Sequence, residues 1–429
     1  MKPIIALILV SGIVSARETP KLPDDPYFAA YALSPAPEPG GLMLKKGAKL
    51  AICGDSITEQ KRYSLIMETY LTACMPQLGV TCRQYGWSGE QAGGFSNRMR
   101  NDVLRFKPDV ATTCYGMNDF RYVPYQEDIA AEYRKNQTAV LQAFQQSGCQ
   151  VLLGSPGIID SVPHWVKSAK GTQHDLNLAL MRFRNINIEL AAANKARFAD
   201  VYQPMLVADW KADKSFGENF RVAGKDGVHP NWAGHLIMAY AFLKGLGLDG
   251  DLGSLTLRGS EAVGASGHEV KSFADGKLTV TSKRFPFSAG PGDVANDDSI
   301  RAGLALVPFD AELNRFTLRV EKPAAARYAV TWGKETKEYA AADLEKGVNL
   351  AADFIEHPLL APFRKVWDAA AKKQAYETRQ IKELFHGPEG AADLDGIAAV
   401  TEKVHARLAA DLAASFQPVE NVIEVKPLP

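Results

Sequence analysis

The sequence has no excess of either charge. Lys and Arg together number 49, as do Asp and Glu, so the formal net charge at pH 7 is zero. This balance gives the protein no general attraction to nucleic acid or to an anionic membrane surface. We therefore expect a neutral substrate, or one held by specific contacts, and no nucleic-acid partner.

Long hydrophobic runs are also missing. The apolar run at residues 4–10 follows Lys2 and precedes small residues that end at Ala16. It is shorter than the about 20 residues that a membrane span needs, and no later segment is long and apolar enough. The pattern is typical of a secretory signal peptide. We expect residues 1–16 to be removed and the protein to be secreted or periplasmic, with no membrane span.

Cysteines are few, five in all, and their number is odd. Cys74 and Cys82 are the nearest candidates for a disulfide in an oxidising compartment. The alternative is a set of buried thiols, because Cys53, Cys114 and Cys149 each lie in an apolar run. The spacing of the cysteines predicts no metal site.

The 429-residue chain is long enough for two domains, and its character changes along its length. Residues 17–44 are rich in proline, which predicts an extended lead-in peptide. Residues 45–248 alternate short apolar runs with helical patterns, as in a parallel sheet covered on both faces. Residues 249–429 show strands followed by two long helices, so we expect a C-terminal accessory region of α+β type there. No segment repeats with a period of 20–50 residues, so we do not expect a solenoid or a propeller.

The expected strands mark where chemistry can lie. In the first region they fall at 49–53, 80–85, 110–115, 151–155 and 198–202, with helices near 62–75, 97–106, 127–147, 175–195 and 231–245. In the second region strands are expected at 255–257, 278–281, 316–320 and 328–331, and helices near 362–386 and 392–415. Ligands of open parallel sheets bind beyond the carboxyl ends of the strands. The loops after the first-region strands are therefore the expected place for a functional site.

Two segments in those loops offer a nucleophile and a base. Gly54-Asp55-Ser56 follows the first strand, where an exposed serine hydroxyl would lie beside the free N–H groups of a helix start. Asp226 and His229, three residues apart, precede the last helix of the region. On a tight turn, His229 can accept the serine proton while Asp226 orients the imidazole ring.

Two further segments offer hydrogen-bond donors. Residues 86–89, Gly-Trp-Ser-Gly, follow the second strand, and a glycine allows a backbone N–H to approach a substrate closely. Residues 116–119, Gly-Met-Asn-Asp, follow the third strand, and Asn118 can direct an amide N–H at a developing oxyanion. Each segment alone is also an ordinary turn or helix cap. All four in this order favour a serine hydrolase.

These four segments resemble those of the GDSL/SGNH hydrolase superfamily over residues 45–248. The resemblance implies a three-layer α/β/α fold with a parallel, flavodoxin-like sheet. It also implies a serine esterase with a catalytic triad of Ser56, His229 and Asp226.

The same resemblance implies an oxyanion hole made by the backbone N–H groups of Ser56 and a glycine, together with the Asn118 amide. Gly89 matches the glycine of the second segment best, and Gly86 is the alternative. Such a mechanism requires no metal and no organic cofactor.

The loops at the strand ends are rich in aromatic side chains, and these side chains suggest a class of substrate. Trp87, Tyr122 and Trp165, with Arg121 among them, form a possible substrate rim. Aromatic faces beside hydrogen-bonding groups suit sugar rings, although each ring taken singly is more simply an anchor packed on the core. No long apolar lid typical of a lipase is present.

We therefore expect a secreted esterase that removes O-acetyl groups from carbohydrate, either a small molecule or a polysaccharide. One alternative is a lipolytic or aryl-ester hydrolase. Another, of a different class, is a carbohydrate-binding protein whose catalytic site has decayed. The sequence does not predict the oligomeric state.

Overall fold

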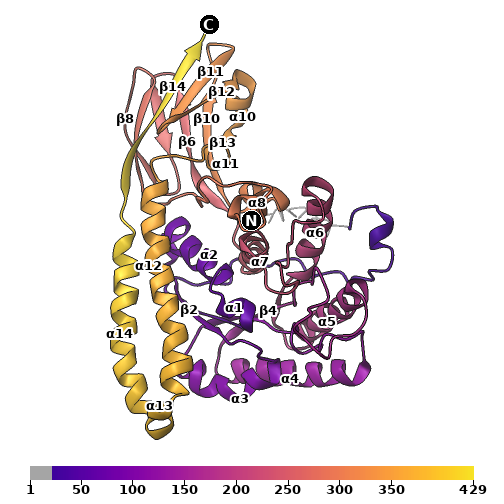
Figure 1. The fold of residues 1–429 in the computed structure, drawn as a ribbon. Coiled ribbons are helices and arrows are strands. Elements are labelled where there is room, and N and C mark those ends of the chain that lie inside the picture. The colour runs from indigo at the N-terminus through magenta and orange to yellow at the C-terminus, as the bar shows by residue number, and fades with distance from the viewer. Residues whose placement is uncertain (1–21) are drawn as a thin grey trace, which may run out of the picture.

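The computed structural model describes residues 22–429 and contains a parallel-sheet region, two further sheets and a pair of long helices (Figure 1). The predicted signal peptide, residues 1–16, lies outside the described residues. No helix among residues 22–429 is both long and apolar enough to cross a membrane.

Five parallel strands form the central sheet, in the order β2-β1-β3-β4-β5. Their bounds are β1 Lys49–Gly54, β2 Thr81–Gly86, β3 Val110–Cys114, β4 Gln150–Gly154 and β5 Arg197–Ala199. β3 is buried along its whole length, as expected for a strand with helices on both faces. This strand order is the flavodoxin-like one, so the predicted α/β fold is confirmed.

Helices cover both faces of this sheet (Figure 1). On one face α3 (Ala92–Asp102), α4 (Glu127–Gln146) and α5 (Gln173–Ala193) pack side by side. On the other face α2 (Tyr63–Thr69) packs against α7 (Trp232–Gly245). The buried residues of α4 recur every three to four positions, which gives the helix one apolar face toward the sheet.

Two helices of this region differ from the expectation. α3 begins at Ala92 rather than near 97. Gly93 and Gly94 have low helix propensity, so the sequence pattern did not predict this first turn. The sequence pattern does not predict α6 (Tyr202–Phe216), which begins where the fifth strand was expected to end. That strand is shorter, since β5 ends at Ala199.

The C-terminal region contains two sheets that pack face to face. Their strand orders are β13-β10-β6-β7 and β12-β11-β14-β9-β8. Phe316 of β10 meets Trp332 of β11 across the interface, with ring centroids 5.7 Å apart. The strands are β6 Asp251–Arg258, β7 Glu261–Gly264, β8 His268–Ala274, β9 Lys277–Ser282, β10 Arg315–Glu321, β11 Arg327–Trp332, β12 Glu335–Ala340, β13 Val348–Asn349 and β14 Val419–Leu428.

The long helices α12 (Leu360–Arg379) and α14 (Leu394–Ser415) form a hairpin close to the predicted positions. The expected order of strands before helices is wrong, because β14 follows the hairpin and lies between β11 and β9. The alternation in β14 involves only three buried residues, which is too short a pattern to predict a strand. A π-helical turn, Gln380–Phe385, continues α12. The short helices are α1 Ser56–Glu59, α8 Ile300–Leu306, α9 Phe309–Glu312, α10 Ala341–Lys346, α11 Leu350–Asp353 and α13 Pro388–Ala392.

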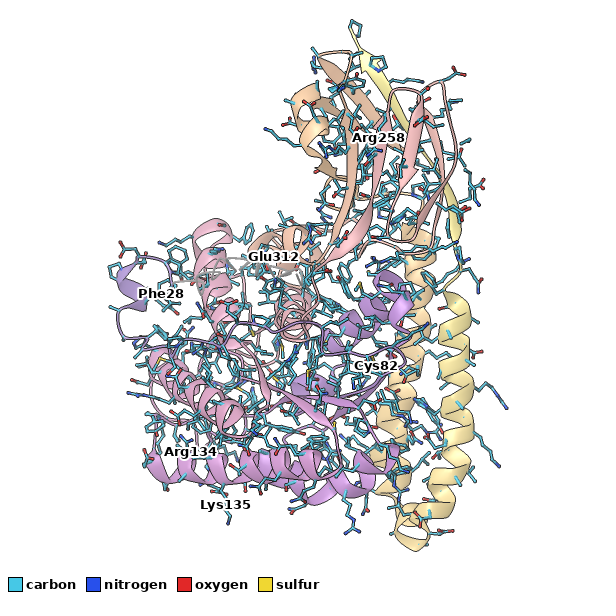
Figure 2. All side chains as sticks on the ribbon, turned by 180° about the vertical axis from the view of Figure 1, so that it is seen from behind. Phe28, Cys82, Arg134, Lys135, Arg258 and Glu312 are labelled. Carbon is cyan, nitrogen blue, oxygen red and sulfur yellow. The ribbon has the colours of Figure 1, made fainter. Side chains whose placement is uncertain are left out.

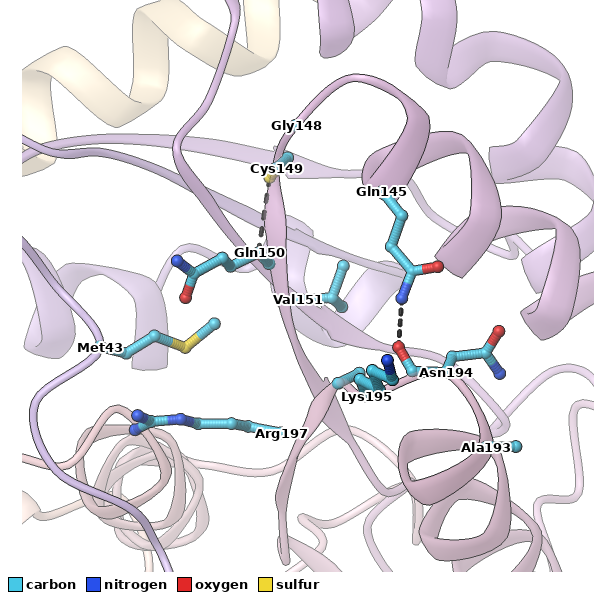
Figure 3. Close-up of a pocket in the computed structure, with 11 residues that line it drawn as sticks. Met43, Gln145, Gly148, Cys149, Gln150, Val151, Ala193, Asn194, Lys195 and Arg197 are labelled. Atoms are coloured by element: carbon cyan, nitrogen blue, oxygen red, sulfur yellow. Dashed lines mark hydrogen bonds between the residues drawn. The ribbon is translucent and has the colours of Figure 1, made fainter.

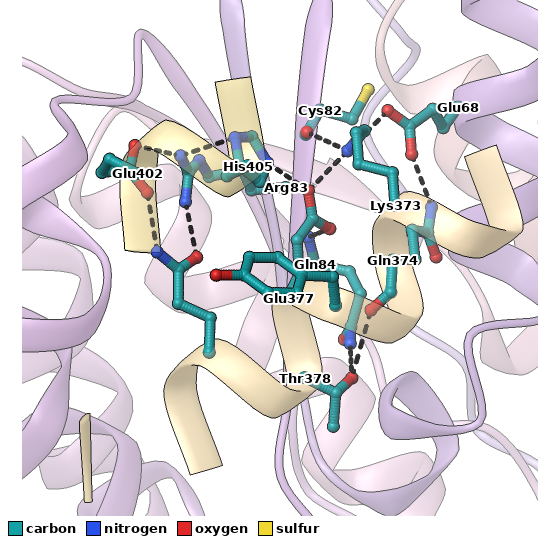
Figure 4. Close-up of polar contacts among 12 residues, drawn as sticks. Glu68, Cys82, Arg83, Gln84, Lys373, Gln374, Glu377, Thr378, Glu402 and His405 are labelled. Carbon is teal, nitrogen blue, oxygen red and sulfur yellow. Dashed lines mark hydrogen bonds and ion pairs between the residues drawn. The ribbon is translucent and has the colours of Figure 1, made fainter. Parts of the chain in front are cut away.

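The hairpin packs against the edge of the parallel sheet, where α12 contacts β2 and α2. The buried Lys373 ammonium lies 2.9 Å from Glu68 of α2 and 2.5 Å from Glu377, and it donates to the Cys82 carbonyl at 2.9 Å (Figure 4). Seen from behind, Cys82 lies beside the two long helices (Figure 2). A buried charge is tolerated only with such partners, so these contacts fix α12 on the parallel sheet.

All five cysteines are buried free thiols. The candidate pair Cys74 and Cys82 therefore forms no disulfide. The alternative prediction, that the cysteines are buried thiols that behave as apolar residues, agrees with the structure. Within the described range, no group of three or more His, Cys, Asp or Glu side chains is arranged to hold a metal ion.

Candidate active site

Ser56 lies at the carboxyl end of β1, where the chain turns directly into α1. Asp55 caps this helix, because its carboxylate accepts the Ile57 N–H at 3.0 Å. The Ser56 side chain remains partly exposed at the first position of the helix. A serine in this place has its hydroxyl open to a substrate and unpaired helix N–H groups close by.

The structure brings together the three residues predicted for the triad. His229 Nε2 lies 2.8 Å from Ser56 Oγ, and His229 Nδ1 lies 2.7 Å from Asp226 Oδ2. With Nδ1–H donating to the carboxylate, Nε2 is free to accept the serine proton. The arrangement can therefore generate a nucleophilic serine.

The second carboxylate oxygen of Asp226 fixes the turn that carries the histidine. It accepts the backbone N–H of Val228 at 3.0 Å and that of His229 at 2.9 Å. Burial alone would raise the pKa of Asp226, but these hydrogen bonds outweigh burial and hold the pKa below its ordinary value. An ionised Asp226 stabilises the imidazolium that forms when His229 takes a proton.

The Asn118 amide has a defined orientation beside Asp55, the residue before Ser56. Its Nδ2 lies 3.1 Å from the Glu90 carbonyl oxygen and 3.5 Å from Asp55 Oδ2, while the Tyr122 hydroxyl donates to its Oδ1 at 3.3 Å. Acceptors around Nδ2 and a donor at Oδ1 select one amide orientation. Arg121 and Tyr122 both have φ of 58°, a strained left-handed conformation that turns Tyr122 back onto Asn118.

Of the two glycines considered as oxyanion donors, the surroundings favour Gly89. The Gly86 N–H already donates to Gln84 Oε1 at 2.7 Å, and a Cβ at Gly86 would lie 2.1 Å from the Glu59 nitrogen. Gly86 thus allows α1 to pack closely on β2. Gly89 is exposed with φ of 73°, and no atom lies within 4 Å of where its Cβ would be. Its N–H has no hydrogen-bond partner among residues 22–429.

Two buried carboxyl groups that were not singled out from the sequence support this site. Asp119 accepts the N–H groups of Ala92 at 2.9 Å and Gly116 at 3.0 Å, which joins the loop after β3 to the start of α3. Burial raises the pKa of Asp55 and of Asp119 to about 7. Asp55 and Asp119 both lie within the four segments described above. Their presence in those segments could have indicated a role near the active site.

Two predicted rim residues lie next to the catalytic histidine. The Trp165 ring stacks on the His229 ring, with centroids 5.7 Å apart and an interplanar angle of 30°. Tyr122 meets Trp165 edge-on at 5.8 Å. Trp165 is 45% exposed, so one face of its ring is available to a ligand.

The other two rim residues have partners within the protein. Arg121 is paired with Glu132 of α4. Trp87 is half-buried and meets His386 of the C-terminal hairpin edge-on, with ring centroids 4.8 Å apart. No sequence pattern predicts this contact, because His386 is distant from Trp87 in the chain.

A surface cavity lies at the opposite end of the parallel sheet (Figure 3). Gln150 and Arg197, at the starts of β4 and β5, line it together with Gln145 and Asn194. Ser56 lies beyond the carboxyl end of β1, where sites of such sheets form. The cavity is therefore separate from the candidate active site.

The family model of the GDSL-like lipase/acylhydrolase family matches residues 52–237. An acetylxylan esterase from Geobacillus stearothermophilus is 24% identical over 230 residues, which are 48% of this chain and 98% of that protein. A catalytic mutant of an acetylxylan esterase from the same organism has a solved structure that matches 48% of this chain and 97% of its own, with 21% identity and a TM-score of 0.40.

The solved structure of a gut microbial diltiazem-metabolizing enzyme matches much more of the fold. It covers 91% of this chain and 100% of its own, with a TM-score of 0.72 and 20% identity. That protein therefore shares the fold of the C-terminal region as well as that of the parallel sheet. The family match and the four segments that it spans show that residues 52–237 are similar to the GDSL-like lipase/acylhydrolase family, and the chain is an ester-hydrolysing enzyme.

Proposed function

We propose that the chain is an exported carbohydrate O-acetyl esterase with Ser56 as its nucleophile. The observation that carries the proposal is the continuous hydrogen-bonded series from Ser56 Oγ through His229 to Asp226, at 2.8 and 2.7 Å. Its members are the residue types that acyl transfer needs, in the geometry that it needs.

In the proposed mechanism, Ser56 Oγ attacks the ester carbonyl carbon while His229 Nε2 takes the hydroxyl proton. The carbonyl oxygen becomes an oxyanion, which accepts hydrogen bonds from the N–H groups of Ser56 and Gly89 and from the Asn118 amide. His229 then protonates the leaving alcohol as the C–O bond breaks. Water, deprotonated by the same histidine, attacks the acyl-serine and releases the acid with Ser56 restored.

The sugar preference is supported by Trp165, which presents an exposed ring face next to His229. A sugar ring can stack there while its acetyl group reaches Ser56. The similarity to an acetylxylan esterase points to the same substrate class.

Acetate release from an acetylated xylo-oligosaccharide and from p-nitrophenyl acetate tests the proposal. Wild-type protein should release acetate from both, and Ser56→Ala should release none while keeping its thermal unfolding midpoint, since only a partly exposed hydroxyl is removed. Acetate release at the wild-type rate by folded Ser56→Ala would refute the nucleophile. Activity on long-chain acyl esters alone would replace the carbohydrate substrate by a lipolytic one.

A further inference from the structure

The C-terminal hairpin is linked to the loop that carries Gly89 through one carboxylate. Lys382, in the π-helical turn after α12, places its Nζ 2.7 Å from Glu59 Oε1. Glu59 is the last residue of α1, the helix that begins with Ser56. Its other oxygen, Oε2, accepts both the N–H and the hydroxyl of Ser88 at 2.5 Å. Glu59 therefore joins the hairpin, the nucleophile helix and the residue next to Gly89.

This ion pair is partly buried, unlike ordinary surface pairs. The side chains of Lys382 and Glu59 are 27% and 19% exposed. Burial alone would raise the pKa of Glu59, but the hydrogen bonds from Lys382 and Ser88 outweigh burial and lower the pKa. The carboxylate therefore stays charged and can hold Ser88 in place. By contrast, the pair between Arg379 and Glu383 in the same helical segment is largely exposed.

The neighbouring Trp87 ring is held from two sides. The Lys382 ammonium lies 5.2 Å from its centroid and the Arg98 guanidinium 5.0 Å, both within the range of cation–π attraction. His386 packs against the ring edge and also contacts Asp102 Oδ2 of α3 at 2.8 Å. The Trp87 N–H donates to the Gly54 carbonyl at 3.0 Å, next to the nucleophile turn.

The helix that leads to Lys382 is anchored on the parallel sheet by buried contacts. Lys373, one helical segment earlier, is buried between Glu68 and Glu377 on the edge of the parallel sheet (Figure 4). A donor to an oxyanion must be held to within about 0.5 Å to be effective. Gly89 itself has open space around it, so the flanking contacts of Trp87 and Ser88 fix its position.

We propose that Lys382 is a positioning residue of the oxyanion hole, acting through Glu59 and Ser88 on the Gly89 N–H. This inference rests on the proposed function, in which that N–H binds the oxyanion. Lys382 itself does not touch the substrate. The hairpin is then part of the scaffold of the active site, and the family motifs alone do not complete the oxyanion hole of this chain.

The test compares Lys382→Met, which keeps the side-chain length and removes the charge, with Arg379→Met on the same helical segment as the matched control. With p-nitrophenyl acetate, Lys382→Met should lower kcat by about tenfold, a part of the 10²–10³ that complete loss of one oxyanion donor costs. KM should change little, because the oxyanion exists only after attack. Arg379→Met should match the wild type, and Lys382→Arg should recover most of the rate.

Two further measurements separate positioning from a general loss of stability. A phenylboronic acid forms a tetrahedral adduct with a reactive serine, so its inhibition constant should rise with Lys382→Met by the same factor as kcat falls. In a Glu59→Gln background, Lys382→Met should cause no further loss, because the two residues act in series. The inhibition constants and the rates of the double variant are measured at a temperature well below the thermal unfolding midpoint of each variant.

Equal kcat values for Lys382→Met and Arg379→Met would refute the inference while leaving the proposed function intact. Additive losses from Lys382→Met and Glu59→Gln would refute the route through Glu59. If Lys382→Met does not fold, Ser88→Ala tests the same route, and an unchanged boronic acid affinity in that variant would refute it. Failure of the proposed function is recognised separately, by acetate release in the Ser56→Ala protein.

Discussion

Replacement of Asn118 by alanine should give a large and specific loss of turnover. The variant removes an amide donor that lies against Asp55, next to Ser56 in the chain, and leaves the triad contacts of Ser56, His229 and Asp226 in place. Loss of one such donor costs about 10²–10³ in kcat, or roughly 2.7–4 kcal/mol of transition-state stabilisation. KM should stay close to that of the wild type, since the ground-state ester carries no oxyanion.

The surroundings of Asn118 set the cost in stability and supply a graded control. Its removal leaves the Glu90 carbonyl and the Tyr122 hydroxyl without these partners. Both sites are only partly buried, so each should cost about 1 kcal/mol or less in the free energy of unfolding. Tyr122→Phe keeps the amide but removes the bond that orients it. A net hydrogen bond of about 0.5–1.5 kcal/mol corresponds to a loss in kcat of roughly two- to twelvefold.

Initial rates with p-nitrophenyl acetate, measured together with thermal unfolding, check this order. The expected ranking of kcat is wild type, Tyr122→Phe, Asn118→Ala and then Ser56→Ala, which serves as the blank. If folded Asn118→Ala kept kcat within threefold of the wild type, Asn118 would not be an oxyanion donor. If Tyr122→Phe were as slow as Asn118→Ala, the hydroxyl would have a role beyond orienting the amide.

Three further predictions follow from other contacts. Trp165→Ala should lower the rate on an acetylated oligosaccharide more than the rate on p-nitrophenyl acetate, and equal losses on the two substrates would exclude Trp165 from sugar recognition. Trp87→Ala should lower the two rates equally, because the Trp87 side chain supports the loop that carries Gly89. Rates on p-nitrophenyl esters should peak at acetate and fall by octanoate, whereas a steady rise, worth about 0.8 kcal/mol per buried methylene, would indicate a lipid groove. Burial lowers the pKa of His357 to about 3, so the folded state disfavours its protonation and stability is lost as pH falls below the unfolded value of about 6.5. Chemical denaturation of wild type and His357→Gln should then show the wild type losing about 2 kcal/mol more between pH 7 and pH 5, and parallel pH profiles would contradict this.

The parallel sheet and the triad could be predicted from the sequence because their signals are local. β1 and β3 are short segments of mainly apolar and small residues, buried along almost their whole length, as expected for strands covered by helices on both faces. Asp226 and His229 are three residues apart, so one turn holds both. Ser56 is far from them in the chain, but its place after a strand puts it at the same edge of the sheet.

Contacts between distant segments could not be predicted in the same way. Trp87 is predicted to be a substrate-rim residue, and the contacts of its ring with His386 and Lys382 of the hairpin were not predicted. Periodicity and motif spacing describe neighbours along the chain, and no pattern in either segment specifies the other. β14 was missed for a related reason, since its position between β11 and β9 is decided by packing in the sheet.

The comparison with the Geobacillus acetylxylan esterase sharpens the role of the hairpin. That protein is matched over 98% of its length by 48% of this chain, so most of the C-terminal region has no counterpart in it. Ester hydrolysis by such a relative thus does not require the hairpin.

In this chain, however, α12 covers the edge strand β2, and the buried Lys373 has partners in both the parallel-sheet region and the hairpin. Without α12, the edge of β2 would be open and Glu68 would lose its cation. The parallel sheet and the hairpin therefore share a buried polar interface, and the loop at residues 86–89 lies at their boundary, where Ser88 is linked to Lys382 through Glu59.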